Sequence, residues 1–300
     1  MSASTSSLPA NSRLRTYASF VRLEHTLFSL PLILAGVFSA PAPAMNSGRW
    51  LLTAIAAVGA RTAGMSLNRL IDRRLDARNP RTRVRELPSG RMRLAEAVAL
   101  LVASTAAYLG ACAALGRWYL EVAAIPLAVF TLYPYLKRFT PLCHLGVGTA
   151  LALSPLAGYA AAHPDLAHPW PAFALAAFAL AWVSGFDIIY ATLDEASDRE
   201  NGIHSLVVWL GKPRALRVSW ALHVAAMAAL AAAWWSLAPG RPMLLPFAAA
   251  LACFVATVVL LVLEQKWAED VNLAFFKTNV YVGLAVFGMV LAARWGSGGF

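Results

Sequence analysis

Nine apolar segments, each close to the length that crosses a lipid bilayer, dominate this chain of 300 residues. A helix needs about 20 consecutive apolar residues to span the hydrocarbon core, and backbone polar groups in lipid must bond within the segment. The segments are residues 24–43, 50–71, 94–115, 118–136, 142–161, 169–194, 215–237, 242–264 and 271–293. We therefore predict an all-α polytopic membrane protein with nine transmembrane helices in one bundle.

The composition agrees with a protein embedded in lipid. Hydrophobic residues make up 59% of the chain and charged residues only 13%, whereas about a quarter of the residues of a soluble domain are charged. The formal net charge is +10. Because the basic residues gather between apolar segments, we attribute this excess to membrane topology and expect the lipid bilayer, and no nucleic acid, as a partner. The oligomeric state is left open.

The distribution of lysine and arginine predicts how the chain is oriented, because cytoplasmic loops carry an excess of both. Counting alternate loops from an internal N-terminus places eighteen of these residues inside and four outside. The outer four are Arg49, Arg117, Arg241 and Arg294. We predict a multi-pass protein of the inner (cytoplasmic) cell membrane with a cytoplasmic N-terminus and an external C-terminus. A disordered N-terminus, residues 1–16, is expected before one domain, residues 17–300.

The stretch ARTAGMSLNRLIDRRLD carries polar side chains at the end of an apolar segment. Asn68, Asp72 and Asp76 are four residues apart, a spacing that aligns them on one face of a helix. The acidic pair recurs 122 residues later as Asp194 and Asp198. Because charge inside a bilayer is costly, a polar face of this kind is a candidate functional site.

The second acidic motif lies in GFDIIYATLDEASDRENGIHS. Asp194 and Asp198 follow Asp187 by seven and eleven residues, and Tyr190 lies between Asp187 and Asp194. On a continuous helix these spacings place the three carboxylates on one face. We predict such a helix, ending at the cytoplasmic side like the first.

Two facing sets of carboxylates favour a divalent cation. Mg²⁺ prefers oxygen ligands and is commonly bound by one or two carboxylates together with substrate phosphates. Lys137, Arg138 and the arginine-rich loop after Asp76 add positive charge suited to phosphate oxygens. The alternative is that acidic residues at helix ends pair with nearby arginines and face water. The matched spacing of the two motifs favours the metal site.

Arg61 lies eleven residues before Asp72, about 16 Å along the helix and so near the middle of the bilayer. Its planar guanidinium suits a substrate carboxylate at the floor of a cavity, and a structural pairing with a buried carboxylate is the alternative. Arg22, Glu24 and His25 lie at the start of the first apolar segment, and we expect Arg22 to point inward.

Three stretches of the chain closely resemble the UbiA superfamily of intramembrane aromatic prenyltransferases. They are NRLIDRRLDARNPRTRVRELPSGR, YPYLKRFT and DIIYATLDEASDRENGIHS. The resemblance implies a helical bundle with a central cavity opening to the cytoplasmic side. It also implies Mg²⁺-dependent transfer of a polyprenyl group from polyprenyl diphosphate to a small aromatic acid, in ubiquinone or menaquinone biosynthesis.

The resemblance further implies a role for individual residues, carried over onto the matching motifs. The expected metal ligands are Asn68, Asp72, Asp76, Asp194 and Asp198. The expected diphosphate-binding residues are Lys137, Arg138 and Arg22. The expected catalytic residues are Asp187 and Tyr190, and the expected acceptor-binding residues are Arg61 and Tyr133. Asp187 is expected to accept the proton that leaves the acceptor ring.

Several alternatives stay open at this point. The acceptor implied is 4-hydroxybenzoate, but RLEHTLFSLP and GIHS look more like a branch that prenylates 1,4-dihydroxy-6-naphthoate for menaquinone. Both acceptors bear a carboxylate, so Arg61 does not separate them. A cation-coupled transporter is a remote alternative, disfavoured because the acidic motifs lie at inner helix ends and not at the midplane. A CDP-alcohol phosphotransferase is disfavoured because Asn68 occupies a position where that family has glycine.

Overall fold

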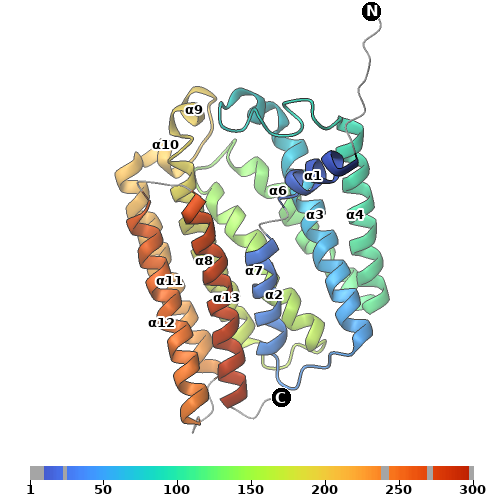
Figure 1. The fold of residues 1–300 in the computed structure, drawn as a ribbon, viewed down its shortest axis with the longest axis vertical. Coiled ribbons are helices and arrows are strands. Elements are labelled where there is room, and N and C mark those ends of the chain that lie inside the picture. Colours follow the sequence, from blue (N-terminus) through green and yellow to red (C-terminus); the bar gives the residue numbers. More distant parts are fainter. Residues whose placement is uncertain (1–9, 23–25, 238–242, 269–272, 297–300) are drawn as a thin grey trace, which may run out of the picture.

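The computed structural model describes residues 10–22, 26–237, 243–268 and 273–296. Within these ranges every regular element is a helix, which confirms the predicted all-α class. The helices are α1 (Ala10–Phe20), α2 (Thr26–Ser39), α3 (Ser47–Arg78), α4 (Leu94–Leu115), α5 (Arg117–Val122), α6 (Ala124–Leu136), α7 (Cys143–Ala162), α8 (Trp170–Ala191), α9 (Glu195–Glu200), α10 (Leu206–Leu210), α11 (Lys212–Leu237), α12 (Leu244–Lys266) and α13 (Leu273–Gly296). The long helices run side by side in one bundle (Figure 1).

The described chain contains eight helical segments long and apolar enough to cross a membrane, which confirms the polytopic membrane class. One of them, Arg117–Leu136, combines α5 and α6. The first predicted apolar segment corresponds to α2, which has 14 residues and is shorter than a full span. The predicted count of nine is therefore approximate.

Helix α8 supplies much of the core. It is apolar on nearly all sides, as expected for a helix surrounded by others. Leu175, Phe178, Trp182 and Ile189 have no exposed surface. The rings of Phe178 and Trp182 stack with their centroids 5.5 Å apart. This packing holds α8 in one rotational position and so determines where its polar residues point.

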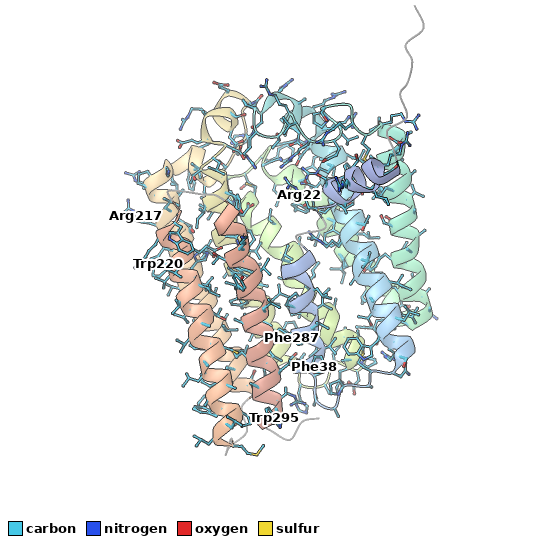
Figure 2. The ribbon with its side chains drawn as sticks, viewed as in Figure 1. Arg22, Phe38, Arg217, Trp220, Phe287 and Trp295 are labelled. Carbon is cyan, nitrogen blue, oxygen red and sulfur yellow. The ribbon has the colours of Figure 1, made fainter. Side chains whose placement is uncertain are left out.

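Helices α2 and α7 approach each other so closely that only glycine fits at the contact. A Cβ added at Gly36 would lie 2.1 Å from the carbonyl oxygen of Pro155, and one at Gly158 would lie 2.0 Å from that of Ile33. Small residues at helix interfaces are the usual means of close packing in membranes, where lipid offers no hydrophobic drive for association. On the other side of α2, Phe38 contacts Phe287 of α13 at 5.8 Å between ring centroids (Figure 2).

One end of the bundle carries most of the polar structure. Helices α1, α9 and α10 and the loop 79–93 lie there together (Figure 1). Arg22 follows α1 near this end, whereas Trp295 lies at the opposite end (Figure 2). The polar end is thus the place where the acidic motifs and the arginine-rich loop meet.

Residues 10–16 were expected to be disordered, but the structure places them in α1. The physical reason lies at the end of this helix, where Phe20 is fully buried beside Met92 and Ala97. Arg13 also lies 3.4 Å from a carboxylate oxygen of Glu96. Burial of an aromatic ring stabilises the helix against the bundle despite the polar composition of its first turns.

Candidate functional site

The first acidic motif lies on the last turns of α3, as predicted. The amide Nδ2 of Asn68 donates to Oδ2 of Asp72 at 3.2 Å, which shows that the two side chains share a helical face. Asp72 and Asp76 are only 1% and 6% exposed. Because α3 continues to Arg78, all three motif residues are held by one rigid helix.

The cations at the end of α6 meet Asp72. The Nζ atom of Lys137 lies 2.6 Å from Oδ2 of Asp72, and a guanidinium nitrogen of Arg138 lies 3.5 Å from Oδ1. The same nitrogen of Arg138 donates to the carbonyl oxygen of Ile71 at 2.9 Å. The structure therefore brings Lys137 and Arg138 to the first motif.

The arginine-rich loop folds back on Asp76. One guanidinium nitrogen of Arg85 donates to both carboxylate oxygens of Asp76, at 2.8 and 3.0 Å. The hydroxyl of Thr82 donates to the main-chain oxygen of Asp76 at 3.0 Å. These bonds fix the loop over the end of α3 and keep its positive charge beside the carboxylates.

The second motif is not on one helix, and this part of the prediction is wrong. Helix α8 ends at Ala191, and Asp194 immediately precedes the short helix α9. The amides of Thr192 and Asp194 bond to carbonyl oxygens three residues earlier, each at 3.1 Å, so the chain tightens into a turn. Asp187 therefore lies on α8, whereas Asp198 lies on α9.

The turn after α8 brings Asp194 to the loop after α3. Oδ1 of Asp194 accepts a hydrogen bond from Nδ2 of Asn79 at 2.9 Å and one from Nε of Arg81 at 2.8 Å. A second guanidinium nitrogen of Arg81 bonds to Oδ2. The two motifs are thus joined, although Asn79 and Arg81 were not singled out from the sequence. The basic run ARNPRTRVR was the signal that pointed to this loop.

Asp194 and Asp198 differ in their electrostatic surroundings. Burial opposes the ionisation of Asp194, but the hydrogen bonds and charge of Arg81 outweigh it and lower the pKa of this carboxyl. Burial, reinforced by the charge of Asp194, raises the pKa of Asp198 to about 6. The charge of Lys137 lies close enough to Asp198 to oppose this rise. A bound cation would favour the ionised form of both carboxyls.

The donor set at this end of the bundle matches the preference of Mg²⁺. Every candidate ligand offers oxygen, from four carboxylates and the amide of Asn68. Among the described residues, no three His, Cys, Asp or Glu side chains converge into a ready-made metal cluster. Mg²⁺ rarely occupies all-protein cages and is usually shared with substrate phosphates, so this arrangement fits an ion that arrives with a diphosphate.

The residues expected to line the reacting centre lie deeper in the bundle. The hydroxyl of Tyr133, on α6, lies within electrostatic range of Arg61, Asp72 and Asp187. Tyr133 packs closely against α7: a Cβ added at Gly146 of that helix would lie 3.0 Å from the Cβ of Tyr133. Residues from α3, α6 and α8 therefore converge near one tyrosine.

Asp187 and Tyr190, both on α8, have different neighbours. Oδ2 of Asp187 lies 2.7 Å from Nδ1 of His144. The ring of Tyr190 makes an edge contact with Phe186, at 6.3 Å between centroids, and lies within electrostatic range of Arg22 and Arg81. His144 had no recognisable sequence signal, because it forms no metal-ligand spacing with other histidines.

Two of the polar residues at the start of the first apolar segment, Glu24 and His25, lie outside the described residues. Arg22 is described and half-buried, with a left-handed backbone at φ 50°. Its charge acts on Tyr190 and on Arg69 of α3. Arg22 therefore lies on the side of the bundle where the candidate site is found.

Comparison with known proteins identifies a family and several relatives. Residues 29–294 match the UbiA prenyltransferase family. A 4-hydroxybenzoate octaprenyltransferase of Sodalis glossinidius is 29% identical, over 76% of this chain and 76% of its own length. The protein of the same name from Vibrio campbellii is 25% identical, over 94% of this chain and 98% of its own.

Solved structures show the same architecture. The apo structure of a UbiA homologue from Aeropyrum pernix K1 has a TM-score of 0.80 and 32% identity, covering 90% of this chain and 98% of its own. A UbiA homologue from Archaeoglobus fulgidus bound to GPP and Mg²⁺ has a TM-score of 0.71 over 93% of this chain and 99% of its own. That protein is 16% identical, so its likeness concerns the fold. The family match covers most of this chain, and the two acidic motifs are joined in the structure. This chain therefore belongs to the UbiA prenyltransferase family.

Proposed function

We propose that this chain transfers a polyprenyl group from polyprenyl diphosphate to an aromatic carboxylic acid, with Mg²⁺ as cofactor. The proposed acceptor is 4-hydroxybenzoate, alkylated on the ring carbon ortho to its hydroxyl, as a step of quinone biosynthesis. The observation that carries the proposal is that both acidic motifs meet cations at one end of the bundle, Asp72 with Lys137 and Asp194 with Arg81. The names of the curated relatives support the acceptor.

The diphosphate is proposed to bind between the two motifs, where carboxylates and cations alternate. The residues that would hold the metal are Asn68, Asp72, Asp76, Asp194 and Asp198. When bound, Mg²⁺ neutralises the charge that develops on the departing diphosphate. The side chains of Lys137 and Arg138 are 27% and 28% exposed, which leaves them room to turn from Asp72 to phosphate oxygens. Arg22 is proposed as a third diphosphate-binding residue.

The chemical step then follows from the residues deeper in the bundle. The carbon–oxygen bond of the prenyl diphosphate breaks with both electrons leaving on the diphosphate, and the acceptor ring carbon forms the new carbon–carbon bond. Tyr133 and Tyr190 are proposed to stabilise the allylic cation through their ring faces. Arg61 is proposed to hold the acceptor carboxylate, and Asp187 to accept the ring proton as general base.

The proposed orientation places the polar end of the bundle in the cytoplasm. The loop 79–93, α1 and α9 all lie at this end (Figure 1), and they carry much of the basic excess that marks cytoplasmic segments. Within the inner membrane, the polyprenyl tail would lie in the bilayer while its diphosphate reaches the acidic motifs. Residues 17–300 are proposed to act as a single catalytic domain.

The alternative acceptor is 1,4-dihydroxy-6-naphthoate, and an acceptor competition separates the two. Purified protein in lipid is given Mg²⁺, geranyl diphosphate and both acceptors at equal concentration, and the products are read by mass spectrometry. We expect prenylated hydroxybenzoate. Prenylated naphthoate as the sole product would show that the acceptor is 1,4-dihydroxy-6-naphthoate and not 4-hydroxybenzoate. If folded protein forms neither product, the proposed prenyl transfer is overturned and the alternative of a cation-coupled transporter is favoured.

A further inference from the structure

His144 lies in the first turn of α7 and is fixed on three sides. Its Nδ1 atom lies 2.7 Å from Oδ2 of Asp187 on α8. Its Nε2 atom accepts a hydrogen bond from the main-chain amide of Leu206 at 3.4 Å. Its carbonyl oxygen accepts one from the hydroxyl of Ser184 at 3.2 Å. The imidazole is only 4% exposed, so these partners replace water.

The contact with Leu206 determines where the imidazole carries its proton. A main-chain amide can only donate, so Nε2 must present its lone pair. The proton of the neutral ring then lies on Nδ1, and His144 donates to the carboxylate of Asp187. Because the far nitrogen faces main chain and not solvent, His144 offers no onward path for a proton.

One oxygen of the Asp187 carboxylate, Oδ2, is hydrogen-bonded to His144, and the side chain of Asp187 is otherwise partly exposed. Its side chain is 31% exposed, although it is on a helix whose neighbouring residues Phe186 and Ile188 are buried. The hydrogen bond at Oδ2 removes rotational freedom from the carboxylate. A base that is held in one orientation needs less reorganisation to reach the proton it accepts.

The segment that fixes His144 also contacts the other end of the site. The amide of Ile203 donates to the carbonyl of Asp198 at 2.8 Å, and that of His204 donates to the carbonyl of Lys137 at 2.7 Å. Two residues later the amide of Leu206 reaches His144. One stretch of main chain therefore links α6, the second motif and the imidazole.

We propose that His144 is a positioning residue that aims the carboxylate of Asp187 at the acceptor ring, a role that rests on the proposed prenyl transfer. His144 does not touch the substrate. A purely structural link between α7 and α8 is the competing account, because the same hydrogen bond joins the two helices.

Two substitutions at this position separate the accounts. The amide nitrogen of His144→Asn takes nearly the place of Nδ1 and keeps the hydrogen bond to Asp187. The side-chain amide oxygen of His144→Gln reaches the place of Nε2 and accepts the hydrogen bond from Leu206 instead. Both variants leave a polar group of moderate size in the site. His163→Gln, at the other end of the same helix, serves as the control.

We expect kcat of His144→Gln to fall on the order of 10- to 100-fold, part of the 10²- to 10⁴-fold that a positioned base contributes. KM for both substrates stays within about twofold. His144→Asn retains most of kcat, and His163→Gln is unchanged. In an Asp187→Asn background His144→Gln has little further effect, because the two residues act through one carboxylate.

Equal kcat values for the Asn and Gln variants would overturn the positioning role while leaving the proposed function standing. A further large loss of kcat when His144→Gln is added to Asp187→Asn would also overturn the positioning role. Wild-type protein that is folded but forms no prenylated acceptor would overturn the proposed function, and the role of His144 with it.

Discussion

Arg81 donates two hydrogen bonds to Asp194, a residue 113 positions further along the chain. The bonds join the loop after α3 to the turn after α8, and Asn79 adds a third at 2.9 Å. The distance between the two acidic motifs is therefore set by side chains that neither motif contains. A ligand that binds both motifs must accommodate this connection or replace it.

Arg81→Met tests the importance of this connection. Loss of the two hydrogen bonds from a partly exposed guanidinium, together about 1.5 kcal/mol, is expected to raise KM for polyprenyl diphosphate on the order of tenfold. The side chain of Arg81 is 43% exposed, so the stability of the protein should change by less than about 1 kcal/mol. Steady-state kinetics and thermal unfolding measure the two effects. Arg83→Met, exposed in the same loop, is the control, and an equal effect there would contradict a specific role.

Arg61→Gln tests the proposed acceptor contact. If Arg61 binds the acceptor carboxylate, its loss should raise KM for the acceptor about 10- to 100-fold and that for polyprenyl diphosphate much less. The methyl ester of the acceptor, which has no carboxylate charge, should react with wild type and variant at similar efficiency. A variant that discriminates between acid and ester as strongly as wild type would exclude Arg61 from this role.

The Mg²⁺ requirement has a readout that does not depend on turnover. Mg²⁺ and geranyl diphosphate together should raise the unfolding temperature of the wild-type protein, because a ligand that binds only the folded state stabilises it. Asp72→Asn should abolish this shift, and chelation with EDTA should reverse it. Glu121→Gln, a 57% exposed acidic residue outside the candidate site, should keep the full shift. A shift of equal size in Asp72→Asn would remove Asp72 from the metal site.

The close contact between α2 and α7 should be sensitive to a single methyl group. Gly158→Ala places a Cβ 2.0 Å from a main-chain oxygen, so the helices must separate, and we expect a loss of about 1–3 kcal/mol. Gly110→Ala, on α4, meets nothing within 4 Å and should be neutral or stabilising by up to about 1 kcal/mol. Unfolding in detergent compares the two. Similar stability in both variants would show that α2 and α7 are not tightly packed.

The first motif could be predicted because its geometry is local. Asn68, Asp72 and Asp76 share one uninterrupted helix, so their spacing alone determines that they lie on one face. The sequence placed Lys137 near the same end of the bundle as a phosphate-binding cation, but it did not predict the contact between Lys137 and Asp72. It depends on how α6 packs against α3, which no spacing within one segment reveals.

The second motif could not be read in the same way. Whether α8 continues past Ala191 depends on a turn stabilised by Arg81 and Asn79, residues more than a hundred positions away. The contact between His144 and Asp187 is likewise a product of α7 packing against α8. Residues 10–16 form a helix because Phe20 has a buried site to occupy, which the polar composition of the segment conceals.

The most direct test of the account measures product formation by the wild type and by one variant of each motif. Wild-type protein, Asp72→Asn and Asp194→Asn, each shown to be folded, are incubated with Mg²⁺, geranyl diphosphate and 4-hydroxybenzoate, and the acceptor is analysed by mass spectrometry. The account predicts a prenylated hydroxybenzoate from the wild type and a loss on the order of a thousandfold in each variant. Comparable product from either variant, or none from the wild type, would contradict it.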